Sequence, residues 1–148
     1  ERHAGILRFV KALTAFRQRR DIVAEGSKVS LNQLLERAKI EWHGVALNCP
    51  DWSEHSHSLA FTLRSLRAHF LLHGMLNAYW EPLTFELPPV PAESQQRWRR
   101  CIDTALASPD DIYPWEKAPL VAEATYVVQP RSFVLLALAL QATPDQES

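Results

Sequence analysis

The sequence predicts a mainly β protein, an antiparallel β-sandwich preceded by one or two helices. In several short runs apolar residues recur at every second position, the period of a strand with one face in a core. Turn signals separate these runs at short intervals, and about seven such runs are typical of a sandwich. Only the first part of the chain shows the three- and four-residue spacing of a helix.

Size and charge set limits on the function. The chain has 148 residues, 47% of them hydrophobic, which suits one domain with a real core. Its formal net charge of −1 gives no global electrostatic case for nucleic acid or a membrane as a partner. No apolar run approaches the roughly 20 residues that cross a bilayer.

The cysteines and the first residues bear on where the protein is found. Two cysteines, Cys49 and Cys101, favour a reducing cytoplasm. A start without methionine or signal peptide suggests a processed or excised fragment.

The first predicted element is an amphipathic helix from Ala4 to Arg19. Its apolar stripe consists of Ile6, Phe9, Val10, Leu13 and Phe16. Basic residues lie mostly off this stripe, namely Arg8, Lys11, Arg17, Arg19 and Arg20. We interpret them as a solvated face and not as a surface for nucleic acid or membrane, because acidic residues elsewhere balance their charge. Between Ile22 and Lys39 the pattern fits a short helix, Leu31 to Ala38 capped by Ser30, or a turn-rich connector.

The period changes from helix to strand at Ile40. Predicted strands cover Ile40 to Val45, Ser58 to Leu66, His69 to Leu76, Leu83 to Leu87, Arg97 to Thr104, Thr125 to Val128 and Ser132 to Leu140. Loops are predicted over Leu47 to Ser58 and Ala107 to Leu120, a turn of helix over Ala92 to Gln96, and a frayed tail from Gln141 to Ser148.

Two of these strands carry the strongest patterns. Leu83, Phe85 and Leu87 should face a core, with the residues between them in water. The stretch from His69 to Leu76 is almost continuously apolar, which predicts a central strand covered on both faces.

Several stretches carry a resemblance to a known family. They are IEWHGV, PDWSEHSHSLAFTL, NAYWEPLTFELP, WRRCIDTAL and YVVQPRSFVLLAL, in that order from Ile40 to Leu140. Together they resemble the end of isoamylase-type glycogen-debranching enzymes of the α-amylase superfamily. The resemblance implies that residues 1–39 hold the last helix of a catalytic (β/α)₈ barrel and a connector. Residues 40–148 would then form the C-terminal sandwich.

The resemblance also implies a function. Such enzymes hydrolyse α-1,6 branch linkages in glycogen or limit dextrin with a carboxylate nucleophile and a carboxylic general acid. The family's catalytic motifs have no match here, so no catalytic, cofactor-binding or metal-binding residue is assigned. We expect a cytoplasmic, non-catalytic domain that supports the barrel and is inactive alone. Its expected partners are the barrel of the same polypeptide and, through the full enzyme, glycogen or limit dextrin.

Three further hypotheses stay open. Phe9, Leu13 and Phe16 should cover the sandwich or mediate self-association, because large apolar patches rarely stay wet. The chain could be an independent carbohydrate-binding sandwich. It could also be a structural or interaction module unrelated to glycan.

Candidate metal and catalytic patterns favour structural roles. His55 and His57, with His43 nearby, are spaced for a metal only if they share a strand, and no further ligand completes the set. Ser53, Ser56 and Glu54 supply triad residue types beside these histidines but no nucleophile elbow. Neither cysteine has a feature that would activate a thiolate. His69 and His73 are expected to be packed or hydrogen-bonded, and Arg131 to form a surface ion pair.

Five tryptophans are a high count for this length. They are Trp42, Trp52, Trp80, Trp98 and Trp115. We favour core or interdomain packing for them over a glycan platform, for which Trp80 and Tyr79 would be the best pair. Trp52 is expected to anchor its loop against the sandwich or the barrel.

Overall fold

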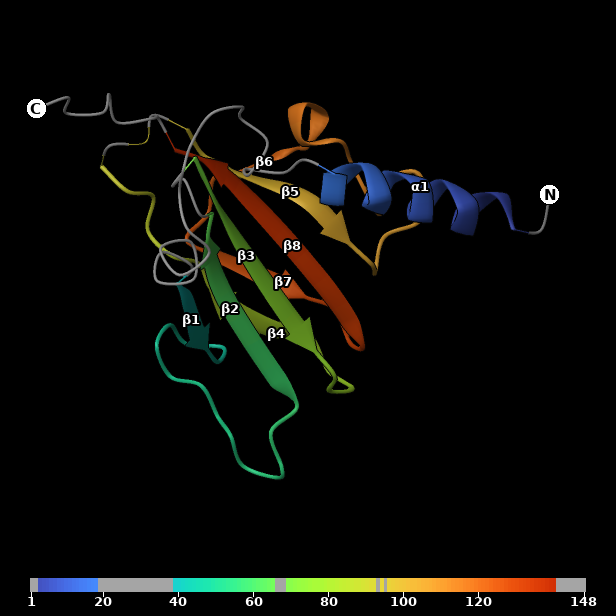
Figure 1. Ribbon diagram of the computed structural model, residues 1–148. Coiled ribbons are helices and arrows are strands. Elements are labelled where there is room, and N and C mark those ends of the chain that lie inside the picture. Colours follow the sequence, from blue (N-terminus) through green and yellow to red (C-terminus); the bar gives the residue numbers. More distant parts are fainter. Residues whose placement is uncertain (1–2, 19–38, 66–68, 93, 95, 141–148) are drawn as a thin grey trace, which may run out of the picture.

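The computed structural model describes residues 3–18, 39–65, 69–92, 94 and 96–140 (Figure 1). Its elements are α1 (Ala4–Gln18), β1 (Ile40–His43), β2 (Ser58–Arg64), β3 (Phe70–Asn77), β4 (Leu83–Glu86), β5 (Trp98–Asp103), a short 3-10 helix η1 (Trp115–Lys117), β6 (Leu120–Val121), β7 (Thr125–Val128) and β8 (Ser132–Ala139). The predicted fold class, mainly antiparallel β with an N-terminal helix, is confirmed.

The strands form two sheets. The larger has the order β1-β2-β3-β8-β5-β6, and the smaller pairs β4 with β7. Every pair is antiparallel. The smaller sheet lies against one face of the larger sheet, here called the inner face, and α1 lies beside the opposite, outer face (Figure 1).

The main core fills the space between the two sheets. Its fully buried side chains include Met75, Phe85, Val128, Val134, Leu136 and Leu138. Phe85 and Leu87 are buried, Leu83 is partly buried, and Thr84 and Glu86 are exposed. The predicted alternation of this strand is therefore confirmed.

A second core lies on the outer face, under α1 and the loop that contains η1. Buried residues of β5 and β8, among them Cys101, Ile102 and Ala137, meet Phe9, Ala12 and Phe16 of α1 there. The prediction that Phe9, Leu13 and Phe16 cover the sandwich is thus confirmed for Phe9 and Phe16. It is wrong for Leu13, which is exposed, so self-association stays the prediction for that residue. Because both faces of β8 are covered, its residues from Ser132 to Leu138 are buried or nearly so.

The outer face is left uncovered over part of β1, β2 and β3. The burial expected for both faces of β3 holds along most of the strand but is wrong at Leu76, which is exposed. Its cross-strand neighbour Leu59 is only partly buried. This uncovered part of the sheet is where the aromatic surface described below lies.

Other differences from prediction are local. The predicted loop from Ala107 to Leu120 contains η1 and the start of β6, a two-residue strand that pairs with β5 and is too short to show any period. In the stretch from Ala92 to Gln96, predicted as a turn of helix, the Ser94 N–H donates to the Pro91 carbonyl and closes a turn. Glu93 and Gln95 lie outside the described residues, so a helical conformation of this stretch stays a prediction. Arg19, the predicted helix from Leu31 to Ala38, and the tail lie outside the described residues.

Candidate functional site

The expected metal and catalytic side chains do not converge. His43 is buried on the inner face, whereas His55 and His57 are exposed in the loop between β1 and β2. No group of three His, Cys, Asp or Glu residues able to hold a metal ion occurs within the described ranges. Ser53 accepts a hydrogen bond from the Ser56 N–H through its carbonyl, and the Ser56 hydroxyl donates to the Ser58 carbonyl, so the serines shape the loop.

His43 takes part in a buried hydrogen-bond chain with Thr62 and His73. The Asn48 N–H donates to His43 Nδ1 at 2.9 Å, so the neutral ring carries its proton on Nε2 and donates to Thr62 Oγ1 at 2.9 Å. The Thr62 hydroxyl then donates to His73 Nδ1 at 3.0 Å. His73 therefore carries its proton on Nε2, a buried atom without a hydrogen-bond partner among the described residues. The expectation that His73 is packed and hydrogen-bonded is confirmed.

Protonation of His43 or His73 should destabilise the fold. Burial lowers the pKa of His73 to about 4, with a smaller contribution from His43, and burial also lowers the pKa of His43 against the opposing effect of Glu41. In the unfolded polypeptide a histidine takes up its proton near pH 6.5. The stability that the fold has with His73 neutral is therefore fully present above pH 6.5. It is lost as the pH falls toward 4, by about 3 kcal/mol for His73. Urea unfolding of the wild type and of His73→Gln measures the difference: the wild type should lose more stability over that interval, and equal losses would contradict the assignment.

The cysteines and Arg131 show no chemistry of a catalytic site. Cys49 is exposed, Cys101 is buried, and these two cysteines, the chain's full number, form no disulfide. Arg131 takes a left-handed backbone conformation, with φ 53°, in the turn between β7 and β8. It forms no ion pair with any described residue, so the expected surface ion pair is not found. Among the described residues an ion pair joins Arg8 of α1 to Asp111.

The tryptophans separate into buried and exposed groups. Trp98 is buried in the main core and donates its indole N–H to the Pro88 carbonyl at 2.9 Å. Trp115 packs between Phe16 and Phe70, with ring centroids 6.2 and 5.5 Å away. These two confirm the expected packing, Trp115 holding α1 against the sheet.

The remaining three tryptophans are exposed. Trp52 and Trp80 are 66% and 65% exposed to solvent, and Trp42 is 43% exposed. Core packing is therefore wrong for Trp52 and Trp80, whereas the alternative, packing against another domain, stays a prediction. The sequence did not indicate that these two side chains are exposed, because both tryptophans lie in loops, where no strand period shows which way a side chain points. The Trp52 ring does meet Trp42 of β1, with ring centroids 5.7 Å apart, as expected of a residue that anchors its loop against the sandwich.

Trp52 borders a hollow of about 360 Å³ where β2 begins and β3 ends. Its lining is mixed: Asp51, Trp52, Ser53, Ser56, His57, Ser58, Leu59, Leu76 and Ala78. A row of stacked rings continues from it. The His57 ring stacks on the Tyr79 ring, with centroids 5.7 Å apart and 18° between the ring planes. The centroids of the Tyr79 and Trp80 rings are 4.0 Å apart.

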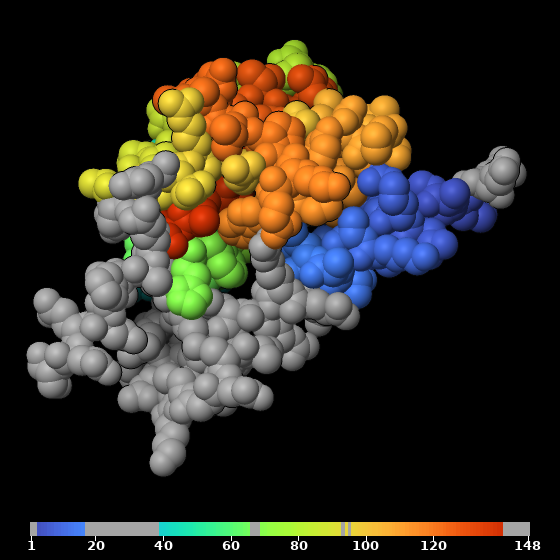
Figure 2. Space-filling view, turned by 90° about the horizontal axis from the view of Figure 1, so that it is seen from above, coloured from blue at the N-terminus to red at the C-terminus, as the bar shows by residue number. Residues whose placement is uncertain are grey.

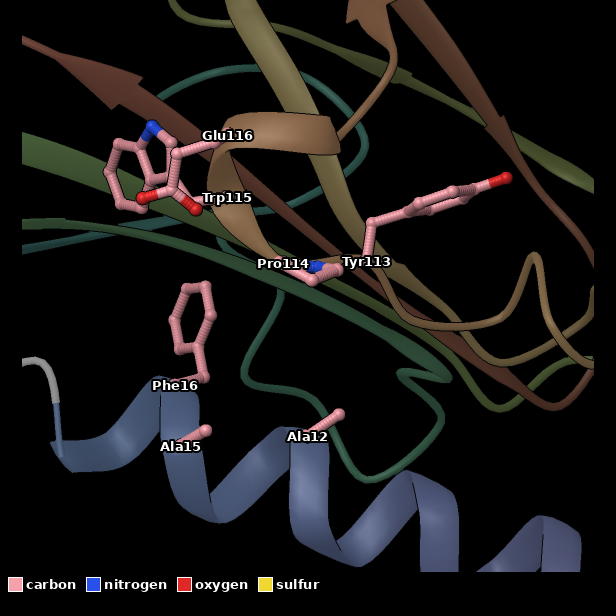
Figure 3. A pocket seen from close by; sticks show the side chains of 7 residues that line it. All are labelled: Ala12, Ala15, Phe16, Tyr113, Pro114, Trp115 and Glu116. Atoms are coloured by element: carbon pink, nitrogen blue, oxygen red, sulfur yellow. The ribbon is translucent and has the colours of Figure 1, made fainter.

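A second hollow, of about 430 Å³, lies between α1 and the loop that contains η1 (Figure 3). Phe16 points from α1 toward Trp115, and Ala12 and Ala15 lie on the same side of the helix. The hollow is mostly apolar, and Glu116 is the single carboxylate among the described residues that line it. Glycoside hydrolysis uses two carboxyl groups that flank the bond, and the described lining of this hollow supplies one.

An exposed apolar stripe runs along α1 beside its packed face. Ile6, Val10 and Leu13, hereafter the outer stripe, are spaced four and three residues apart and so share one side of the helix. They keep 64%, 51% and 43% of their surface. Figure 2 shows α1, in blue, along the flank of the molecule with much of its length facing away from the body. No described helix is long and apolar enough to cross a membrane.

Comparison with known proteins decides the family. A family model described as Isoamylase 1-3, C-terminal, matches residues 41–136, which cover the strands from β1 into β8. The chain belongs to the isoamylase 1-3 C-terminal domain family. The resemblance inferred from the sequence is thereby confirmed.

Two curated relatives agree with this family. The chain is 30% identical over 112 residues to isoamylase 1, chloroplastic, of Arabidopsis thaliana, and 28% identical over 111 residues to isoamylase SU1, chloroplastic, of Zea mays. Each match covers 75% of this chain but 13% of the relative. The isoamylase C-terminal domain described here therefore corresponds to a small part of each relative.

Proposed function

We propose that this isoamylase C-terminal domain is the non-catalytic end of a debranching enzyme that hydrolyses α-1,6-glucosidic linkages, and that it supports a catalytic barrel in the same polypeptide. Family membership supports the parent activity, because both relatives are named isoamylases. The 13% coverage leaves ample chain in such a parent for a barrel. α1 and the residues up to 39 would be the last barrel helix and the connector, and glycogen or limit dextrin the substrate of the whole enzyme.

The outer stripe is the observation that carries the supporting role. One side of α1 is already used by the sandwich, through Phe9 and Phe16. The neighbouring side presents three large apolar side chains to water, an arrangement that a soluble surface rarely keeps unless it is an interaction site. A barrel seated against the outer stripe would bury it. α1 would then be packed on both sides and would join the two domains rigidly.

In the chain alone, the outer stripe is proposed to mediate self-association instead. Light scattering over a dilution series measures this, and a monomer at every concentration would contradict it. A cytoplasmic location is likewise still a prediction, since the two relatives are named as chloroplastic.

The proposed activity is tested by hydrolysis of a branched limit dextrin. The 148-residue chain alone should release no reducing ends, whereas the longer polypeptide that contains it should release them and should carry a pair of catalytic carboxylates before α1. Hydrolysis by the chain alone would contradict the non-catalytic role. A parent polypeptide without such a pair would contradict the enzyme and favour a module unrelated to glycan cleavage.

A carbohydrate-binding domain is the second candidate function, and the exposed Trp80 favours it. Its ring is open to solvent and supported by Tyr79 at 4.0 Å. Binding of glucan and support of a barrel use different surfaces of the domain and are compatible.

A further inference from the structure

The exposed aromatic surface where β2 begins and β3 ends has the chemistry of a sugar-binding site. We propose that the hollow beside Trp52, continued by the row His57–Tyr79–Trp80, binds an α-glucan chain. The choice of α-linked glucose rests on the proposed function, whereas the existence of a sugar site rests on the geometry.

The Trp52 ring is held in place without being buried. It meets Trp42 at 5.7 Å with planes at 73°, and Trp42 meets Phe61 at 6.1 Å with planes at 62°. Phe61 in turn lies over Gly74 of β3, where a Cβ would stand 2.4 Å from the nearest ring atom. This edge-to-face series fixes Trp52 and leaves most of its surface open. The electron-rich face of an indole attracts the apolar C–H groups on one side of a pyranose ring, so an open, fixed tryptophan is a platform for sugar.

Polar groups around the platform match sugar hydroxyls. Asp51 accepts the Ser53 N–H at 2.9 Å, and this backbone hydrogen bond lowers the pKa of its carboxyl. A carboxylate has acceptor positions beyond that one bond, and these can accept hydrogen bonds from the hydroxyl groups of a sugar. Ser56, His57 and Ser58 add hydroxyl and imidazole groups to the lining. An apolar protein partner would remove the exposed Asp51 carboxylate and His57 imidazole from water without offering them new hydrogen bonds, at a cost in binding free energy.

The extent of the surface fits an oligosaccharide. A volume of about 360 Å³ falls within the range of roughly 300–1,000 Å³ that small-molecule sites occupy. His57 lines the hollow and also stacks on Tyr79, so the hollow and the Trp80 ring belong to one continuous surface. The Ala78 N–H donates to the His57 carbonyl at 2.8 Å, which ties the two loops together. Two open indoles on one surface suit a chain of several sugar units.

Maltoheptaose titration and electrophoresis through a glycogen-containing gel test the proposal on the 148-residue chain. The wild type should be retarded and should bind maltoheptaose weakly, on the order of 1 mM. Trp52→Ala and Trp80→Ala should each weaken binding at least tenfold, and Trp52→Phe should keep most of it because a flat ring remains. Leu120→Ala, at an apolar site that is 56% exposed on the far edge of the larger sheet, should leave binding unchanged.

Two results would overturn the site. One is a wild-type chain that glycogen does not retard and that maltoheptaose does not saturate. The other is binding that Trp52→Ala leaves intact. Neither result bears on whether the longer polypeptide hydrolyses limit dextrin. The glucan-binding site can therefore be contradicted while the proposed function is supported. Conversely, glucan binding by a chain whose parent lacks catalytic carboxylates would keep the site and overturn the enzyme.

Discussion

Asn77→Asp is expected to lower the free energy of unfolding by about 3–5 kcal/mol. The buried Asn77 amide donates to the carbonyls of Glu81, Val128 and Gln129 at 2.9, 3.0 and 3.2 Å, while its oxygen accepts the Tyr79 N–H at 2.9 Å. Aspartate keeps the acceptor but removes both donated protons. It also sets a negative charge against three carbonyl oxygens in a site closed to water.

Urea unfolding at pH 7 measures the effect, and Asn48→Asp is the matched control. Asn48 is exposed, so the same chemical change there should alter stability by no more than about 0.5 kcal/mol. The loss in Asn77→Asp should shrink as the pH falls, because a protonated carboxyl regains one donor. Equal effects of the two substitutions would contradict the role assigned to Asn77.

Phe85→Ala should cost about 3–5 kcal/mol of unfolding free energy. Phe85 is fully buried in the core between the two sheets, and its truncation leaves a cavity that the neighbouring strands cannot close. Val127→Ala is the control on the paired strand β7. Its side chain is 49% exposed, and its replacement should cost less than about 1 kcal/mol. Chemical denaturation compares both variants with the wild type, and a loss below 1 kcal/mol for Phe85→Ala would contradict the location of the core.

Local patterns in the sequence were sufficient for most of the fold. The alternation from Leu83 to Leu87 predicted which residues of β4 face the core, because burial of one sheet face imposes a period of two. A two-residue strand such as β6 has no period, and its pairing with Trp98 and Arg99 of β5 exists only once the sheet is assembled. The boundaries of the other strands agree within one or two residues for the same reason.

Tyr79 and Trp80 could be named from the sequence as the best pair for a glycan platform, but the long-range contacts and the position of Trp52 could not be predicted in this way. The amide of Asn77 bonds to carbonyls 51 and 52 residues away along the chain, and the buried chain from His43 to His73 crosses three strands. Trp52 lies in a turn-rich loop whose side-chain directions depend on the strands around it. The resemblance to isoamylases identified the domain but placed none of these contacts.

The most direct test of the central claim, that this domain supports a barrel through the outer stripe of α1, is thiol labelling of Leu13→Cys in a Cys49→Ser background. Leu13 lies on the outer stripe, and Lys11→Cys supplies an exposed control on the same helix. In the 148-residue chain at a dilution that gives monomers, both introduced thiols should react with a maleimide at similar rates. In the longer polypeptide, Leu13→Cys should react at least tenfold more slowly while Lys11→Cys reacts as before. Equal labelling of Leu13→Cys in the chain and in the longer polypeptide would contradict the claim.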